Sequence, residues 1–151
     1  MSEPDSGATR LPRAIVAGHG DFAAGLVSAV QQITGRGGVF RAISARDLSA
    51  TDLDALLART LVETGVNVVF TDLQAGSCSM ATRRLVRDRP DILLVAGANL
   101  PMLLDFVFAD SLPAIEAARH AVERGRAAIT AFGGVARDGG GGGGGGGGSA
   151  R

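Results

Sequence analysis

Short apolar runs alternate with longer segments of helical periodicity along most of this 151-residue chain. Each run is long enough for one strand, and the run at 66–71 is almost wholly apolar, as in strands covered on both faces. Strands that alternate with helices at this spacing form right-handed βαβ units. The sequence therefore predicts an α/β fold, a doubly wound and mostly parallel open sheet with helices on both faces. The predicted strands are 13–17, 39–43, 66–71 and 91–96.

The segments between these runs carry the spacing and end signals of helices. Apolar residues from Phe22 to Ile33 recur on one helix face. The next helix is predicted to begin at Ser49 or Thr51, since either can cap it, and to end at Gly65. Further helices are predicted from Ser77 or Ser79 through Arg87, at 102–109 and at 112–124, and a last short strand at 127–132.

Composition excludes several classes of protein. Lys and Arg together number 15, as do Asp and Glu, and this zero net charge argues against a nucleic-acid binder, whose surface would be basic. No apolar run approaches the ~18 residues of a membrane-spanning helix, and the polar first ten residues do not resemble a signal peptide. The single cysteine forms no internal disulfide, which fits the cytoplasm. We expect a cytoplasmic protein without direct membrane insertion.

Three parts are predicted along the chain: a flexible leader at 1–11, one domain at 12–133 and a disordered glycine-rich tail at 134–151. The tail contains an unbroken glycine run at 139–148. Polyglycine buries no side chain and loses the most backbone entropy on ordering, so this tail is not expected to fold.

The strand at 13–17 runs directly into Gly18-His19-Gly20. Glycine permits a tight turn and lets other groups approach the backbone closely. Because the carboxyl ends of parallel strands meet at one sheet edge, we expect Asp72 and the loop at 97–101 to lie near His19. A carboxylate beside an imidazole accepts its N–H and leaves the other ring nitrogen facing outward.

Ser77 follows Gly76 at the start of a predicted helix, where its hydroxyl and the backbone N–H groups suit a phosphate. Together with His19 and Asp72 they predict a histidine that takes up and releases a phosphoryl group. Each residue also has a structural alternative: a hydrogen-bonded structural histidine, a carboxylate that caps a turn, and a helix cap at Ser77. His120, within a predicted helix, is expected on the surface without a partner.

Two other classes remain open. Ser77, His19 and Asp72 include the residue types of a hydrolase triad, although Ala75-Gly76-Ser77-Cys78-Ser79 lacks the glycine that follows the serine of a nucleophile elbow. A structural or ligand-sensing module without phosphate chemistry is the other class.

Several segments resemble, in order and spacing, the IIA component of the mannose-family sugar phosphotransferase system. The likeness covers roughly residues 13–132 and departs from the family at Cys78, where proline is common, and at Met80, where a polar residue is common. The matching segments are Ile15-Val16-Ala17-Gly18-His19-Gly20, Thr71-Asp72-Leu73 with Gly76-Ser77, Val95-Ala96-Gly97-Ala98-Asn99-Leu100-Pro101-Met102-Leu103-Leu104 and Glu123-Arg124-Gly125-Arg126-Ala127-Ala128-Ile129.

The resemblance implies that His19 is phosphorylated by the carrier protein HPr and passes the phosphoryl group to a IIB component, coupled indirectly to membrane IIC and IID components. It implies that Asp72 orients His19, that Ser77, Gly20 and Gly76 contact the phosphoryl group, and that no metal or cofactor is needed. It also implies a homodimer that exchanges a strand at about 127–132. A stand-alone regulatory IIA, or a donor to a dihydroxyacetone-kinase-type acceptor, is the alternative, since no IIB domain follows in this sequence.

Overall fold

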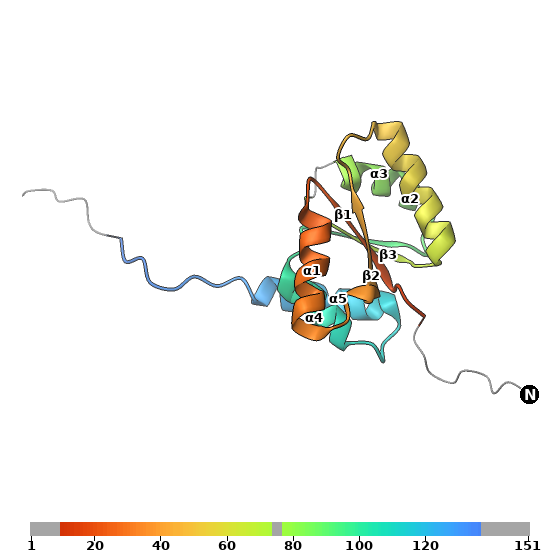
Figure 1. The fold of residues 1–151 in the computed structure, drawn as a ribbon. Helices are drawn as coiled ribbons and strands as arrows, with labels where there is room; N and C mark the ends of the chain where they lie inside the picture. Colours follow the sequence, from red (N-terminus) through yellow and green to blue (C-terminus); the bar gives the residue numbers. More distant parts are fainter. Residues whose placement is uncertain (1–9, 74–76, 137–151) are drawn as a thin grey trace, which may run out of the picture.

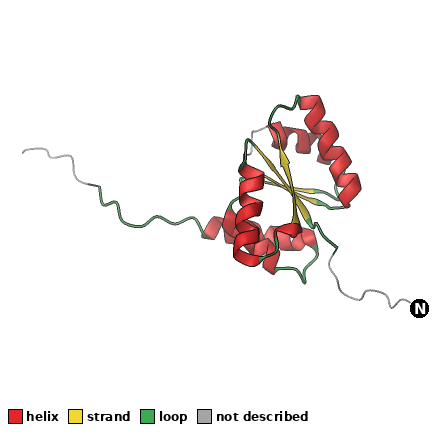
Figure 2. Ribbon diagram, in the orientation of Figure 1, coloured by secondary structure: helices red, strands yellow, loops and turns green. Residues whose placement is uncertain are grey.

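The computed structural model describes residues 10–73 and 77–136. Its centre is a four-stranded sheet in the order β2-β1-β3-β4, and every neighbouring pair of strands is parallel. Figure 2 shows this sheet lying between helices. The predicted α/β fold with a parallel sheet is confirmed. The strands are β1 (Ala14–Gly18), β2 (Phe40–Ser44), β3 (Val68–Thr71) and β4 (Leu93–Ala96).

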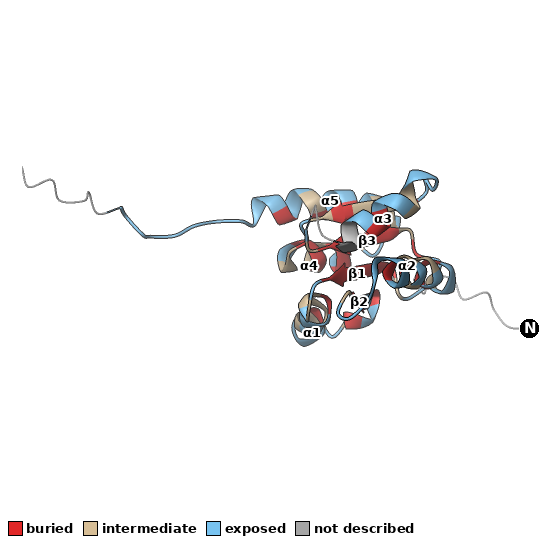
Figure 3. Cartoon of the chain, turned by 90° about the horizontal axis from the view of Figure 1, so that it is seen from above, coloured by how far each residue is buried: buried red, intermediate tan, exposed pale blue. Residues whose placement is uncertain are grey.

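The helices form one layer on each face of the sheet (Figures 1 and 3). Successive residues of β1 point to opposite faces: Val16 packs with α1, α4 and α5, whereas Ile15 packs with α2 and α3. None of the helices in the described ranges is long and apolar enough to cross a membrane. The helices are α1 (Phe22–Thr34), the short 3-10 helix η1 (Gly37–Val39), α2 (Ala50–Thr64), α3 (Ser77–Arg87), α4 (Leu100–Phe108) and α5 (Ala114–Ala127).

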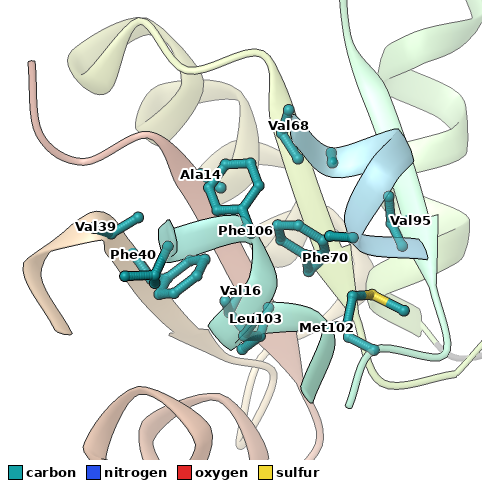
Figure 4. Packing of buried hydrophobic residues seen from close by; sticks show 14 of the residues in the cluster. Ala14, Val16, Val39, Phe40, Val68, Phe70, Val95, Met102, Leu103 and Phe106 are labelled. Carbon is teal, nitrogen blue, oxygen red and sulfur yellow. The ribbon is translucent and has the colours of Figure 1, made fainter. Parts of the chain in front are cut away.

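Three phenylalanine rings hold the larger of the two cores together (Figure 4). The ring centroid of Phe70 lies 5.3 Å from that of Phe106 and 6.1 Å from that of Phe40, both in edge-to-face contact. Aromatic pairs at this separation add to the free energy gained by burying them. The cluster fixes the central strand β3 against α4, and so fixes the strand end from which Asp72 emerges.

Helix ends mostly follow the predicted signals. Of the two candidate caps for α2, Ser49 is the one used, since its Oγ accepts a hydrogen bond from the backbone N–H of Asp52 at 3.1 Å. Gly65 ends the same helix at φ 68°. α4 begins two residues earlier than predicted because the side chain of Asn99 caps it, accepting from the N–H of Met102 at 3.0 Å.

The expected fifth strand does not form within the single chain. Ala127 is the last residue of α5, and residues 128–136 belong to no helix or strand. In Figure 1 this segment runs away from the domain. An extended segment needs a sheet edge to pair with, and the described part of the chain does not return to one.

Candidate functional site

His19 and Asp72 follow the two central strands of the sheet and meet at its carboxyl edge. The register pairs Ala17 of β1 with Thr71 of β3, so the residues just beyond them lie side by side. Nδ1 of His19 lies 2.7 Å from Oδ2 of Asp72, as the sequence predicted. The imidazole is 53% exposed, whereas the carboxylate is only 11% exposed. The site is therefore a mostly buried carboxylate that holds an accessible ring.

Asp72 holds both the backbone and the ring of His19. Its Oδ2 also accepts a hydrogen bond from the backbone N–H of His19 at 2.8 Å. Burial alone would raise the pKa of Asp72, but the hydrogen bonds from the backbone and ring of His19, the charge of His19 and the N–H of Leu73 together lower it.

An ionised carboxylate can only accept hydrogen bonds, so Nδ1 of His19 carries the proton and donates a hydrogen bond to Oδ2 of Asp72. In the neutral imidazole this leaves the lone pair on Nε2, on the far side of the ring. This arrangement fixes the tautomer of a neutral imidazole and leaves the ring accessible, a geometry that suits a nucleophile.

Gly18 makes room for this pair: the sequence indicated that glycine allows a close approach here, but not which groups make it. A Cβ placed on Gly18 would lie 2.6 Å from Cδ1 of Phe22, closer than real Cβ contacts allow, and 3.0 Å from Cγ of Asp72, tighter than most of them. Only glycine lets the carboxylate approach the backbone of His19 this closely.

We expect Gly18→Ala to push Asp72 away from His19 and to lower the free energy of unfolding by about 1–3 kcal/mol, as overpacking does. Urea denaturation measures the stability, and the Nδ1 proton resonance of His19 reports on the hydrogen bond. Gly25→Ala is the control: a Cβ at Gly25, in α1, meets nothing within 4 Å. A Gly18→Ala variant with unchanged stability and an unchanged resonance would contradict the packing role.

Gly20 turns the chain from His19 into α1 with a φ of 50°, a conformation that side chains disfavour. Its carbonyl accepts a hydrogen bond from Oγ of Ser44 at 2.9 Å. The last residue of β2 therefore braces the loop that carries His19, a contact between neighbouring strand ends that the sequence analysis missed. The predicted contact of Gly20 with phosphate stays a prediction.

Two of the predicted site residues cannot be placed against His19. Gly76 lies outside the described residues, and so does the side chain of Ser77. The backbone makes Ser77 the first residue of α3, which agrees with its predicted position at a helix start. The phosphate contacts predicted for both residues stay predictions, and so does the hydrolase alternative that depends on Ser77. No three or more His, Cys, Asp or Glu side chains gather as a metal site in the described ranges.

His120 was expected on the surface without a partner, and the second half of that expectation is wrong. Its side chain is 53% exposed, but Nδ1 lies 2.8 Å from Oδ2 of Asp105. Asp105 is on α4 and His120 on α5, so only the packing of the two helices brings them together. The chain thus contains two histidine–aspartate pairs of similar geometry. Only the pair at His19 stands at the carboxyl edge of the sheet.

Asn99 joins the same two helices. Besides capping α4, its Nδ2 donates a hydrogen bond to the carbonyl of Gly125 at 3.1 Å. It therefore has a structural role where α4 begins against α5. The segment at 97–101 helps to build the fold beside the site, since the N–H of Ala98 donates a hydrogen bond to the carbonyl of Thr71 at 2.9 Å.

Comparison with known proteins agrees with this fold. The model of the family described as the fructose IIA component of the PTS, the sugar phosphotransferase system, matches residues 13–123, most of the chain. The chain belongs to this IIA family, whose members are phosphotransfer components. No curated protein matches it.

Solved structures support the same family. The mannose/sorbose-specific IIA subunit of the phosphotransferase system from Enterococcus faecalis is 26% identical, with a TM-score of 0.69, over 80% of this chain and 94% of its own. The phosphotransferase system component EIIA from Streptococcus agalactiae is 23% identical, with a TM-score of 0.73, over 80% of this chain and 96% of its own. The second likeness shows the fold alone. Both share the sheet and helix arrangement described above.

Proposed function

We propose that this chain is a phosphoryl carrier that accepts a phosphoryl group on Nε2 of His19 and passes it on. The observation that carries the proposal is the 2.7 Å contact between Nδ1 of His19 and the mostly buried carboxylate of Asp72. It fixes the proton on Nδ1 and leaves Nε2 free to attack phosphorus. Family membership supports the same chemistry.

The transfer step balances without a metal or cofactor. Nε2 attacks phosphorus in line, the Nε2–P bond forms, and the bond from phosphorus to the donor's leaving atom breaks with its electron pair staying on the donor. The Nδ1 proton remains on the ring, where Asp72 offsets the positive charge that develops. The reverse step, onto the next acceptor, uses the same groups.

Asp72→Asn should fold but accept the phosphoryl group about tenfold more slowly, because a neutral amide replaces a charge-assisted hydrogen bond to Nδ1. Rapid-quench measurement of the acceptance rate tests this. An undiminished rate would remove the orienting role of Asp72.

Asp72→Asn should also change how the stability of the protein depends on pH. Because the pKa of Asp72 is lowered in the folded protein, this residue stabilises the fold above the ordinary carboxyl pKa of about 3.9. That contribution is lost as the pH falls through the lowered value. Asp72→Asn should lack this part of the acid unfolding curve. A curve of unchanged shape below pH 4 would argue against the pair as a source of stability.

The proposed donor is phospho-HPr and the proposed acceptor is a IIB component, which places the protein in the cytoplasm beside a membrane transporter. Incubation with phosphoenolpyruvate, enzyme I and HPr, followed by intact mass measurement, tests the donor. One acid-labile phosphoryl group is expected. Mixing the phosphorylated protein with a IIB protein, or with a dihydroxyacetone-kinase-type protein, shows which of them accepts the phosphoryl group. Transfer to the IIB protein favours a transport role. If neither accepts it, a regulatory role is favoured.

We also propose that the chain forms a homodimer by strand exchange. Among the described strands β4 pairs only with β3, and its other side faces a groove of about 910 Å³ between α3 and α5. Beyond α5, Ile129 and Phe132 are 75% and 91% exposed, so this short segment presents two large apolar side chains to a partner. The segment at 128–136 of a second copy would pair with β4. This pairing would fill the groove and cover the side chains of Ile129 and Phe132. Neither His19 nor Asp72 lines this groove, so exchange leaves the site open.

A further inference from the structure

A basic side chain lies against the loop that carries His19. Arg46 belongs to the turn between β2 and α2, and the parallel register of β2 and β1 sets Ser44 beside Gly18. The N–H of Ala45 donates to the carbonyl of Gly18 at 3.1 Å, and Oγ of Ser44 accepts from the N–H of Arg46 at 3.1 Å. Since the same Oγ donates to the carbonyl of Gly20, the segment 44–46 is tied to the residues on both sides of His19.

The guanidinium of Arg46 extends along this loop on its exposed side. Its Nη2 lies 3.3 Å from Oδ1 of Asp21 and 3.5 Å from the point that a Cβ on Gly20 would occupy. Asp21 and Gly20 are the two residues after His19. Both partners of the ion pair are well exposed, so water and salt screen the pair and Arg46 gains little from it.

A phosphoryl group on His19 would change the balance of charge at this loop. It carries up to about two negative charges and three acceptor oxygens, against the single charge of Asp21. The planar fork of a guanidinium matches phosphoryl oxygens with two parallel hydrogen bonds. Asp21 makes no side-chain capping bond to α1, so nothing in the helix depends on its holding Arg46.

We propose that Arg46 binds the phosphoryl group carried by His19, leaving Asp21 when the group arrives and returning to it when the group departs. This inference rests on the proposed function and adds to it a residue that stabilises the phosphorylated form. Asp21 acts as a competitor that keeps Arg46 beside the site and limits how tightly it holds the group, as a carrier requires if it is to pass the group on.

The test uses the pKa of the phosphoryl group itself, read from the ³¹P resonance during a pH titration. The full chain is phosphorylated with phosphoramidate, a small donor that needs no protein partner, at low salt. A guanidinium in contact with the group lowers its second pKa, so Arg46→Ala should raise that pKa by about 0.5–1 unit. Arg46→Lys should restore part of the shift, because it keeps the charge without the fork. Asp21→Asn should move the pKa in the opposite direction to Arg46→Ala, a result that a structural role for the loop would not produce.

The chain provides two internal controls for this titration. Arg59→Ala removes an exposed arginine from α2, where it pairs with Glu63, and should leave the titration unchanged. His120, held by Asp105 and equally exposed, should also react with phosphoramidate, and its ³¹P titration should not respond to Arg46→Ala. His19→Ala and His120→Ala assign the two resonances.

The remaining results separate the inference about Arg46 from the proposed phosphoryl-carrier function. A titration at His19 that is the same in wild type and Arg46→Ala overturns the Arg46 inference, while labelling of His19 by phospho-HPr would still support the carrier function. The predicted shifts without any labelling from phospho-HPr would keep Arg46 as a phosphoryl-binding residue and overturn the proposed donor. Labelling of His120 but not of His19 would contradict both, because Nε2 of His19 would then not be open.

Discussion

His19→Ala should fold normally and lose all phosphoryl acceptance from phospho-HPr, whereas His120→Ala should accept as wild type does. The two histidines make a matched pair, since each is 53% exposed and each places Nδ1 within 2.8 Å of an aspartate oxygen. They differ in their position in the fold. His19 stands on a glycine loop at the carboxyl edge of the sheet, while His120 lies within α5. Intact mass after incubation with the relay proteins measures the difference directly.

The stability of His19→Ala should stay within about 1 kcal/mol of wild type, because the lost side chain is largely exposed and Asp72 keeps its bond from the backbone N–H of residue 19. Thermal unfolding provides this control, so that loss of acceptance cannot come from loss of fold. If His19→Ala accepted the phosphoryl group and His120→Ala did not, His120 would be the acceptor residue and His19 would not. A control IIA protein in the same mixture should be phosphorylated. If it is and the wild-type chain is not, the family membership would describe the fold and not the phosphoryl-carrier function.

The elements of the fold were predictable because they depend on local patterns. The buried run of β1 and the cap and stop of α2, at Ser49 and Gly65, are decided within a few residues of sequence. Boundaries moved where a side chain added a bond that the pattern did not show, as Asn99 did at the start of α4. The last strand was not predictable in the same way, because whether 128–136 becomes a strand depends on a sheet edge elsewhere.

The central contact of the site was also predictable, and its surroundings were not. His19 and Asp72 each follow a central parallel strand, and parallel strands end at one edge, so their proximity follows from order along the chain. The room made by Gly18 for Asp72, the approach of Arg46 to Gly20 and the meeting of His120 with Asp105 arise from packing between separate elements. Residue types and spacing carry no signal for such contacts.

Phe132→Asp should convert a dimer of the wild-type chain largely to monomer, weakening association by about 100-fold or more. Phe132 is 91% exposed in the single chain, so its burial in the proposed dimer would come from contact with the second copy. Burial of one phenylalanine contributes about 2–3 kcal/mol, the loss occurs twice in a two-fold exchange, and a carboxylate would in addition have to leave water. Sedimentation velocity over a range of concentrations measures the change.

Val62→Asp is the matched control, because Val62 is an exposed apolar residue on α2, away from the groove beside β4. It should leave the dimer intact. Amide hydrogen exchange then separates strand exchange from other modes of association. In an exchanged dimer the β4 amides that face the groove hydrogen-bond to the partner's strand and exchange slowly; in Phe132→Asp they should exchange fast. A dimer that survives Phe132→Asp with fast-exchanging β4 amides would be held by another surface, and the exposure of Ile129 and Phe132 would then need a different partner.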